Sequence, residues 1–336
     1  MLSYFWPESR LVTAIPVLRF EKDIPFATIP DTNRHLLCDI WQPNTTLAPS
    51  GLAFIYLHGS AWTLLDKDVG TRTLFNHLAA QGYVIMDVAY RLAPETDMMG
   101  MVNDVKQAIV WMKENAQTYG VNPDTIVVGG GSAGGHLALL AGYTANNPQF
   151  TPKELETKDM SVCGVVSLYG PTDLESMYYH TNQQLTTRLN AGSAKKAIPQ
   201  MPKWLIEIMG KSYHRFHFEN FANAGTFAFI FGGHPDECPK KYALFSPVNH
   251  VNANCPATLL IHGEDDTMAS IQTTRILFKR LKEEKVPTVM HIFPQTDHAF
   301  DLILPKISPA AHTAIYDVER FLALQIKIAE KPKGLI

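Results

Sequence analysis

Cysteines, long basic runs and long hydrophobic runs are all scarce in this 336-residue sequence. No hydrophobic stretch approaches the length of a membrane-spanning helix, so we expect no membrane span. The net charge of −3 gives no electrostatic footprint for nucleic acid, so we expect no nucleic-acid partner. The four cysteines lack Cys-x-x-Cys spacing, which favours reduced packing residues, with a disulfide between the last two as the alternative. They are Cys38, Cys163, Cys238 and Cys255.

The N-terminal region lacks the pattern of a secretory signal. Residues 11–18 are apolar, but Pro16 interrupts the stretch and Arg19 ends it. The composition, with 46% hydrophobic and 18% charged residues, is that of an ordinary globular protein. We therefore expect a soluble, cytoplasmic protein in which residues 1–336 form a single large domain.

Short apolar runs alternate with amphipathic segments along most of the chain. This alternation predicts an α/β fold, with a mostly parallel sheet flanked by helices on both faces. The first strand is expected to be antiparallel to its neighbour. Strands are predicted at 35–43, 52–57, 83–89, 125–128, 162–169, 257–262 and 288–293, and helices at 71–81, 101–119, 271–285 and 310–326.

The alternation stops between about residues 174 and 232. This segment contains no clear strand but is dense in aromatic residues, so it is expected to be folded and not a disordered linker. Its position after a strand predicts an inserted helical cap over the ligand-binding face. The alternative is an extension that packs on the side of the domain.

A glycine-rich turn, Gly130-Gly131-Ser132-Ala133-Gly134, joins a β-branched run to a helical apolar pattern. Strand, tight turn and helix form the context of a Gly-x-Ser-x-Gly nucleophile elbow, which exposes the serine hydroxyl at the sheet edge. We therefore predict that Ser132 is a nucleophile.

The same turn also fits Gly-x-Gly-x-x-Gly, a dinucleotide-binding pattern, through Gly129, Gly131 and Gly134. That alternative needs an acidic residue about 20 positions further on, at the end of the next strand. The acids in that region, Glu154 and Glu156, lie in a polar stretch with no strand pattern. The nucleophile elbow is therefore the favoured interpretation, and we expect no cofactor and no metal.

A serine nucleophile needs a base and an acid that orients the base. For this fold the expected chain order is serine, acid, histidine. His298 lies in a loop directly after a predicted strand, whereas most of the 13 histidines lie outside such loops. The loop after the preceding strand contains three acids, of which Asp266 is favoured over Asp265 and Glu264. The other two are then expected to cap the following helix.

Donors for an oxyanion are expected from backbone N–H groups. The N–H of Ala133, one residue past the nucleophile, points into the site of such an elbow. The loop His58-Gly59-Ser60-Ala61, after an earlier strand, offers further N–H groups. Arg91 and Asp104 are interpreted as a structural ion pair and not as substrate-binding charges.

These motifs together resemble the hormone-sensitive-lipase-like and feruloyl- and acetyl-esterase-like (BD-FAE-like) branch of the α/β-hydrolases. The resemblance extends from His58-Gly59-Ser60-Ala61-Trp62 and Tyr90-Arg91-Leu92-Ala93-Pro94-Glu95 through the elbow to the Asp-His-Ala-Phe loop at 297–300. It implies that Asp266 is the acid and that the N–H groups of Ser60, Ala61 and Ala133 are the oxyanion donors.

Two positions depart from the usual pattern of this branch. Ser60 and Ala61 replace glycines, so backbone strain is expected if these positions have positive φ. A narrower site around the carbonyl would follow. Gly131 stands where an acidic residue is common before the nucleophile, which removes a charge near the triad.

The resulting expectation is a serine carboxylesterase that forms an acyl-enzyme on Ser132. Small-molecule esters with short acyl chains or small aromatic groups are the expected substrates. The alternatives are a peptidase or amidase of the same fold, or a non-catalytic ligand-binding receptor built on this fold. The oligomeric state stays open, with a homodimer as one option.

Overall fold

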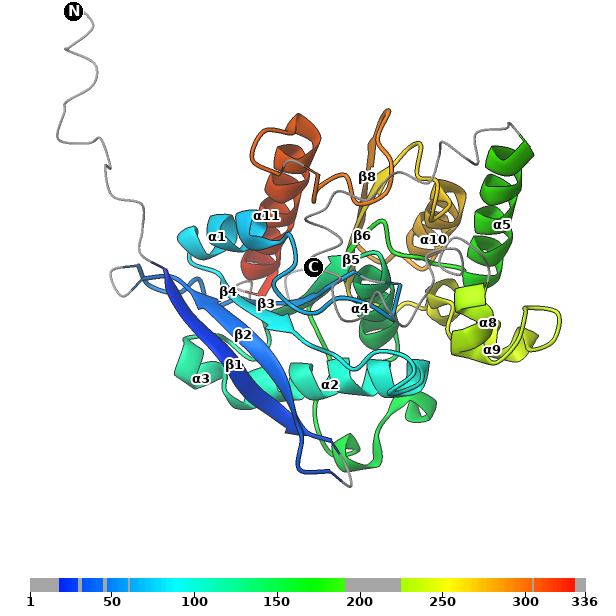
Figure 1. Ribbon diagram of the computed structural model, residues 1–336. Helices are drawn as coiled ribbons and strands as arrows, with labels where there is room; N and C mark the ends of the chain where they lie inside the picture. Colours follow the sequence, from blue (N-terminus) through cyan, green and yellow to red (C-terminus); the bar gives the residue numbers. More distant parts are fainter. Residues whose placement is uncertain are drawn as a thin grey trace, which may run out of the picture.

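The computed structural model describes residues 18–29, 32–44, 47–59, 61–190, 225–303 and 305–329. Within these residues an eight-stranded sheet has the order β1-β2-β4-β3-β5-β6-β7-β8, with helices on both faces (Figure 1). β1 pairs antiparallel with β2, and β2 pairs antiparallel with β4. All further pairs, from β4–β3 to β7–β8, are parallel. The predicted α/β class is confirmed.

The strands lie close to the predicted segments, with one addition. Their bounds are β1 (Arg19–Thr28), β2 (His35–Gln42), β3 (Ala53–Leu57), β4 (Val84–Val88), β5 (Ile126–Gly131), β6 (Gly164–Leu168), β7 (Ala257–Gly263) and β8 (Thr288–Phe293). β1 was not predicted, because it is a largely exposed edge strand with an irregular register against β2. Its pairing is what forms it, and its side chains show no burial pattern.

The helices that flank the sheet are α1 (Arg72–Ala80), α2 (Met98–Glu114), α3 (Ala116–Tyr119), α4 (Ala133–Tyr143), α10 (Ile271–Glu283) and α11 (Pro309–Ala329). The prediction of a single helix at 101–119 is wrong in two respects. It begins earlier, where the Asp97 side chain accepts the Gly100 N–H at 2.9 Å as an N-cap. It is also broken at Asn115, whose side-chain amide donates to the Trp111 carbonyl at 2.8 Å.

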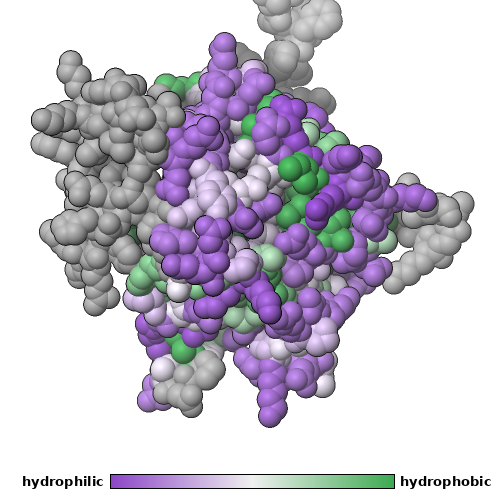
Figure 2. Space-filling view, turned by 90° about the vertical axis from the view of Figure 1, so that its right-hand side faces the viewer, coloured by the Kyte–Doolittle hydropathy of each residue, from purple (hydrophilic) through white to green (hydrophobic). Residues whose placement is uncertain are grey.

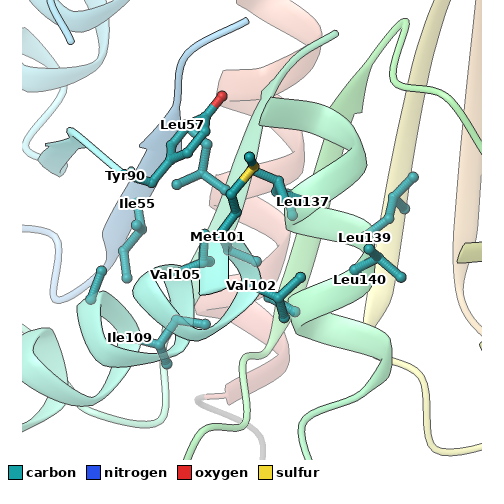
Figure 3. Close-up of a cluster of buried hydrophobic side chains, with 14 of the residues drawn as sticks. Ile55, Leu57, Tyr90, Met101, Val102, Val105, Ile109, Leu137, Leu139 and Leu140 are labelled. Carbon is teal, nitrogen blue, oxygen red and sulfur yellow. The ribbon is translucent and has the colours of Figure 1, made fainter. Parts of the chain in front are cut away.

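Two hydrophobic layers cover the sheet. On one face, Ile55 and Leu57 of β3 pack with side chains of α2 and α4 (Figure 3). On the other face, residues of the strands pack with α1 and α11. Every residue of α4 is buried, as expected for a helix enclosed on all sides. The nucleophile turn therefore begins a helix that is fixed by the core.

The predicted cap at 174–232 is only partly covered by the described residues, since 191–224 lie outside them. Its described parts are α5 (Leu174–Asn190) and α8 (Gly225–Phe231), and α5 contacts α9 (Pro239–Leu244). Viewed from the side that carries α5, α9 and α10, the described surface is mostly hydrophilic with small hydrophobic patches (Figure 2). Whether 174–232 is a distinct cap stays a prediction.

The four cysteines are all free thiols, so the alternative disulfide between Cys238 and Cys255 is not formed. Among the helices that the structure describes, none combines the length and the apolar character needed to cross a membrane.

Candidate active site

Ser132 lies at the turn between β5 and α4, with φ 53° and ψ −120°. This conformation is strained for a residue with a side chain and is the one that a nucleophile elbow imposes. The Ser132 N–H donates to the Leu168 carbonyl at 2.9 Å, and its carbonyl accepts the His136 N–H at 3.0 Å. The strained residue is thus held by β6 on one side and by α4 on the other.

The close Leu57 carbonyl of β3 explains two of the glycines around Ser132, Gly130 in β5 and Gly134 in α4. A Cβ atom would lie 2.2 Å from the Leu57 carbonyl oxygen at Gly130 and 2.0 Å from it at Gly134. The nucleotide-binding alternative gains no support, because β6 ends at Leu168 and is followed by Tyr169, not by an acid. Glu154 lies in the short 3₁₀ helix η3 (Lys153–Leu155).

His298 links the predicted nucleophile to the predicted acid. Its Nε2 lies 2.8 Å from Ser132 Oγ, and its Nδ1 lies 2.7 Å from Asp266 Oδ2. The three side chains follow the carboxyl ends of β5, β7 and β8, which meet at one edge of the parallel sheet. The structure therefore brings together Ser132, His298 and Asp266 in the chain order expected from the sequence.

Asp266 is buried and serves as an acceptor for the backbone as well as for the histidine. Its Oδ1 accepts the N–H groups of Met268 and Ala269 at 2.8 and 2.7 Å. The following helix, α10, is capped by Ser270, whose Oγ accepts the Gln272 N–H. The expectation that Glu264 and Asp265 cap this helix is therefore wrong, because the helix begins beyond their reach.

His262, near the end of β7, is a second partner of Asp266 that the sequence motifs do not mark. Its Nε2 lies 3.1 Å from Asp266 Oδ2 and 2.9 Å from the Ala269 carbonyl, while its Nδ1 lies 3.0 Å from Thr274 Oγ1. Burial opposes ionisation of Asp266, but hydrogen bonds from His262 and His298 outweigh it and hold the pKa of Asp266 well below its usual range. The carboxylate therefore stays charged.

Asp297, the residue before His298, ties the acid loop to the histidine loop. Its Oδ1 accepts the Thr267 N–H at 2.8 Å, the Thr267 hydroxyl at 3.0 Å and the His298 N–H at 2.7 Å. The sequence suggested this only through the adjacency of Asp297 to His298. The two loops that carry the acid and the base are thereby fixed relative to each other.

Tyr169 fills the space behind the nucleophile that Gly131 leaves open. A Cβ atom at Gly131 would lie 2.9 Å from the Tyr169 hydroxyl. The Tyr169 ring packs against the His298 ring with centroids 4.7 Å apart, and its hydroxyl donates to Asp301. Position 131 thus lacks the acid that is common in this branch, but the carboxyl group of Asp301 lies at the Tyr169 hydroxyl.

The predicted oxyanion donors are described only in part. Ala133 is the first residue of α4, where backbone N–H groups have no partner within the helix. Ala61 has φ 48°, so the strain expected from replacing glycine is present there. Ser60 lies outside the described residues. Gly59 lies against the turn, since a Cβ atom there would lie 3.2 Å from Ser132 Cβ.

Trp62 follows Ala61 and anchors this loop to α4. Its indole N–H donates to His136 Nδ1 at 3.2 Å, and His136 Nε2 donates to the Phe245 carbonyl at 2.8 Å. Burial lowers the pKa of His136 to about 4, so the ring is neutral and can accept from the indole. The sequence analysis assigned no role to His136, which lies in an otherwise apolar helix.

Two other groups near the site are structural. His58 stacks on Tyr90, whose hydroxyl donates to the His58 carbonyl at 2.8 Å, so His58 braces its loop. Arg91 Nε donates to Asp104 Oδ2 at 2.9 Å, and the Asp104 side chain is fully buried. The prediction of a structural ion pair is confirmed.

The arrangement can carry out nucleophilic catalysis. A serine hydroxyl within hydrogen-bond distance of a histidine, which in turn is oriented by a buried carboxylate, is the arrangement that activates serine for attack on a carbonyl. Within the described ranges, no three His, Cys, Asp or Glu side chains are grouped as metal ligands.

Comparisons with known proteins agree with this geometry. The sequence is 31% identical over 287 residues to the probable carboxylic ester hydrolase LipM of Mycobacterium tuberculosis, and the match covers 85% of this chain and 57% of LipM. The chain spans about three fifths of the length of the curated relatives it matches, with shares of 57%, 60% and 61%. A truncated carbohydrate esterase from gut microbiota matches with a TM-score of 0.65 and 20% identity, over 92% of this chain and 96% of that one.

A thermophilic esterase of Thermogutta terrifontis, solved with propionate bound, has a similar fold, with a TM-score of 0.63 and 20% identity over 95% of this chain and 98% of that one. At this identity the likeness establishes the fold alone. A model of the prolyl oligopeptidase family matches residues 217–322. The BD-FAE family model matches residues 38–208, half of the sequence, and the chain therefore belongs to the BD-FAE family and has the α/β-hydrolase fold.

Proposed function

We propose that this protein is a serine carboxylesterase in which Ser132 is the nucleophile, His298 the general base and Asp266 the residue that orients His298. The observation that carries the proposal is the position of His298, 2.8 Å from Ser132 Oγ and 2.7 Å from Asp266 Oδ2. The similarity to LipM, a probable carboxylic ester hydrolase, supports the same reaction.

In the first half-reaction, Ser132 Oγ attacks the ester carbonyl carbon while its proton passes to His298 Nε2. The negative charge that develops on the carbonyl oxygen is stabilised by N–H groups, for which we propose Ser60, Ala61 and Ala133. His298 then returns the proton to the leaving alcohol, and an acyl-enzyme remains on Ser132. Asp266 stays ionised throughout, as the direction of its pKa indicates.

In the second half-reaction, water takes the place of the alcohol. His298 accepts a proton from water as the oxygen attacks the acyl carbonyl, and it gives this proton to Ser132 Oγ as the carboxylic acid leaves. These steps consume one ester and one water and produce one acid and one alcohol. They use no cofactor.

We propose short-chain or small aromatic esters as the substrates. Ala61 stands where this branch usually has glycine, and we propose that its methyl group narrows the space beside the ester carbonyl. The Thermogutta terrifontis esterase, whose title names bound propionate, supports a short acyl group by analogy. We also propose that 174–232 forms a cap over this face. The contact of Phe227 in α8 with Trp62, with ring centroids 5.8 Å apart, supports this position.

A peptidase or amidase is the second candidate function, favoured by the match of residues 217–322 to the prolyl oligopeptidase family. This segment contains the loops of Asp266 and His298, which both reaction types use. Hydrolysis of an ester and of the amide with the same acyl group separates the two candidates.

The test is hydrolysis of p-nitrophenyl esters from acetyl to palmitoyl by the wild type and Ser132→Ala, with fluorophosphonate labelling of both. We expect turnover of acetyl and butyryl esters, loss of at least 10³-fold in kcat in the variant, and labelling of Ser132 alone. A control variant, Ser161→Ala, removes a hydroxyl that bonds to Asp159 and Lys113, away from the triad, and should keep full activity. No turnover and no labelling would instead support a non-catalytic ligand-binding protein.

A further inference from the structure

Two buried carboxyl groups face each other beside the β3–α1 loop, residues 58–71. This loop includes Ala61, whose N–H group is a proposed oxyanion donor. Asp39 of β2 and Asp87 of β4 are direct partners in the antiparallel register, and both are 0% exposed. Direct partners in such a pair point to the same face of the sheet, with Cβ atoms about 5 Å apart. The two carboxyl groups are therefore neighbours in the core.

Each of these groups has one oxygen without a hydrogen-bond donor among the described residues. These atoms are Oδ2 of Asp39 and Oδ1 of Asp87. A buried acceptor without a donor is costly, and two ionised carboxylates side by side are costlier still. A proton on one of the two groups would satisfy both oxygens at once.

The other oxygens hold two consecutive residues of the β3–α1 loop. Asp87 Oδ2 accepts the Asp68 N–H at 2.6 Å. Asp39 Oδ1 accepts from Lys67 Nζ at 2.9 Å, and the same ammonium lies 2.6 Å from Asp23 Oδ1. Asp68 has φ 66°, a conformation that persists only where its surroundings enforce it. The two acids therefore fix the loop at the end opposite to Ala61.

The charges around Asp87 favour its neutral form. It faces Asp39 on β2, its register partner Tyr56 on β3, and Lys67 and Asp68 of the loop. The Lys67 ammonium is shared by Asp39 and Asp23, and Arg72 is engaged by Asp68. Burial, together with the charges of Asp39 and Asp68, raises the pKa of Asp87 well above its usual range.

We infer that Asp39 and Asp87 share one proton, which Asp87 carries and donates to Asp39, and that this pair positions the β3–α1 loop for oxyanion stabilisation. Asp39, Asp87 and Lys67 are then positioning residues, since none of them touches the reacting atoms. The catalytic part of this inference rests on the proposed esterase function, whereas the shared proton does not.

Isosteric variants test the proton directly. In Asp87→Asn, an amide N–H can donate to Asp39 and the amide oxygen can still accept from Asp68, so the variant imitates the protonated acid at every pH. Asp39→Asn removes the charge that faces Lys67 and should lower the Tm at every pH. Asp87→Asn should not resemble it.

The pH dependence of the Tm tests whether Asp87 carries a proton in the folded state. Because the pKa of Asp87 is raised in the folded state, the folded wild type binds a proton that the unfolded chain releases above about pH 4, and it loses stability as the pH rises toward the folded-state pKa. Asp87→Asn has no such proton. Its Tm relative to the wild type should therefore rise between pH 5 and pH 8, by about 2 °C per pH unit.

Activity tests the positioning role. Lys67→Met and Asp39→Asn should each lower kcat for a p-nitrophenyl ester about tenfold or more with little change in KM, because the oxyanion is bound only in the transition state. Lys113→Met is the matched control, since Lys113 is also a shielded lysine paired with an aspartate, Asp159, but lies away from the loop. It should keep the wild-type kcat.

Three results would overturn the inference. Asp87→Asn could follow the same pH dependence as the wild type or be as unstable as Asp39→Asn, and then no proton is shared. Added Ca²⁺ could raise the Tm of the wild type but not of Asp87→Asn, and a cation would then replace the proton. Lys67→Met could keep full kcat, which removes the positioning role. Labelling of wild-type Ser132 by a fluorophosphonate distinguishes all of these results from failure of the esterase proposal, because failure of that proposal would give no labelling.

Discussion

Asp266 receives hydrogen bonds from two histidines, and only one of them contacts Ser132. Both histidines contact the same carboxylate oxygen: His262 Nε2 lies 3.1 Å from Asp266 Oδ2, and His298 Nδ1 lies 2.7 Å from it. A carboxylate that has a second donor orients the base more firmly than a single contact would, because the support fixes its rotamer and keeps it ionised. His262 is therefore a positioning residue in the proposed mechanism.

Replacing His262 with Gln should lower kcat about tenfold while KM changes little, because the support acts on the transition state through Asp266 and His298. His291→Gln is the matched control. His291 lies on the adjacent strand β8 and pairs with Asp317, away from the triad. Ester hydrolysis at several substrate concentrations measures both constants. Equal kcat values for His262→Gln and the wild type would show that Asp266 orients His298 without support from His262.

The sequence predicted the chemical groups at the site better than it predicted their supports. Ser132 and His298 follow strands in recognisable motifs, and a loop position limits the acid to three neighbours. His262 lies only four positions before Asp266, but no motif in that strand marks the contact. Asp297 and His136 act through contacts with distant segments, such as the bond from Trp62 to His136 across 74 positions. No local pattern contains such a contact, because the fold alone brings these residues together.

Among the elements, α4 connects the nucleophile at one end to a buried lysine at the other. Lys106 of α2 donates to the Thr144 carbonyl at 2.7 Å, at the C-terminal end of α4. A cation there adds a second hydrogen bond to a carbonyl that also accepts the Asn147 N–H at 3.1 Å, and it interacts favourably with the helix dipole. Burial nevertheless lowers the pKa of Lys106 to about 8.

Lys106 should therefore make stability depend on alkaline pH. Between about pH 8 and 10.5, the unfolded chain holds the lysine proton and the folded protein releases it, so this group's contribution to stability rises with pH. The free energy of unfolding of the wild type relative to Lys106→Met should rise by about 1–3 kcal/mol from pH 8 to pH 10. Urea unfolding at each pH measures it.

Lys113→Met is the control for this prediction, since Lys113 lies on the same helix and pairs with Asp159 near the surface. It should give a difference that is constant over the same pH range. A constant difference for Lys106→Met as well would mean that the buried ammonium keeps its proton to pH 10, contrary to the prediction.

The element boundaries show what sequence periodicity can and cannot supply. Runs buried on both faces, such as β3 and β4, were predicted closely because every residue in them is buried. β1 was missed because most of its side chains are exposed. The break between α2 and α3 was missed because it occurs at Asn115, whose side-chain amide and backbone N–H both donate to the Trp111 carbonyl, and a single polar residue does not interrupt an apolar period.

In the molecule as a whole, the buried acids whose pKa values are raised and the buried histidines respond to acidification in opposite directions. Burial raises the pKa values of Asp87 and Asp104, so these groups gain folded-state protons and stabilise the protein as the pH falls. Burial lowers the pKa values of His58 and His136 to about 4, so acid favours the unfolded chain, in which they can be protonated. The stability of the wild type between pH 6.5 and 4.5 therefore depends on the balance between these two opposing contributions.

Removing one buried histidine should shift that balance measurably. His136→Gln lacks the group that the unfolded wild type protonates below about pH 6.5, so it should lose less stability on acidification. The difference should be about 1.4 kcal/mol per pH unit between pH 6 and 4.5. Urea unfolding gives the slope, which is independent of any constant destabilisation from the lost bond to Trp62. His35→Gln, at an exposed position, should run parallel to the wild type. Parallel lines for His136→Gln would mean that His136 is protonated inside the folded protein, and the acceptor for the Trp62 indole would then have to lie elsewhere.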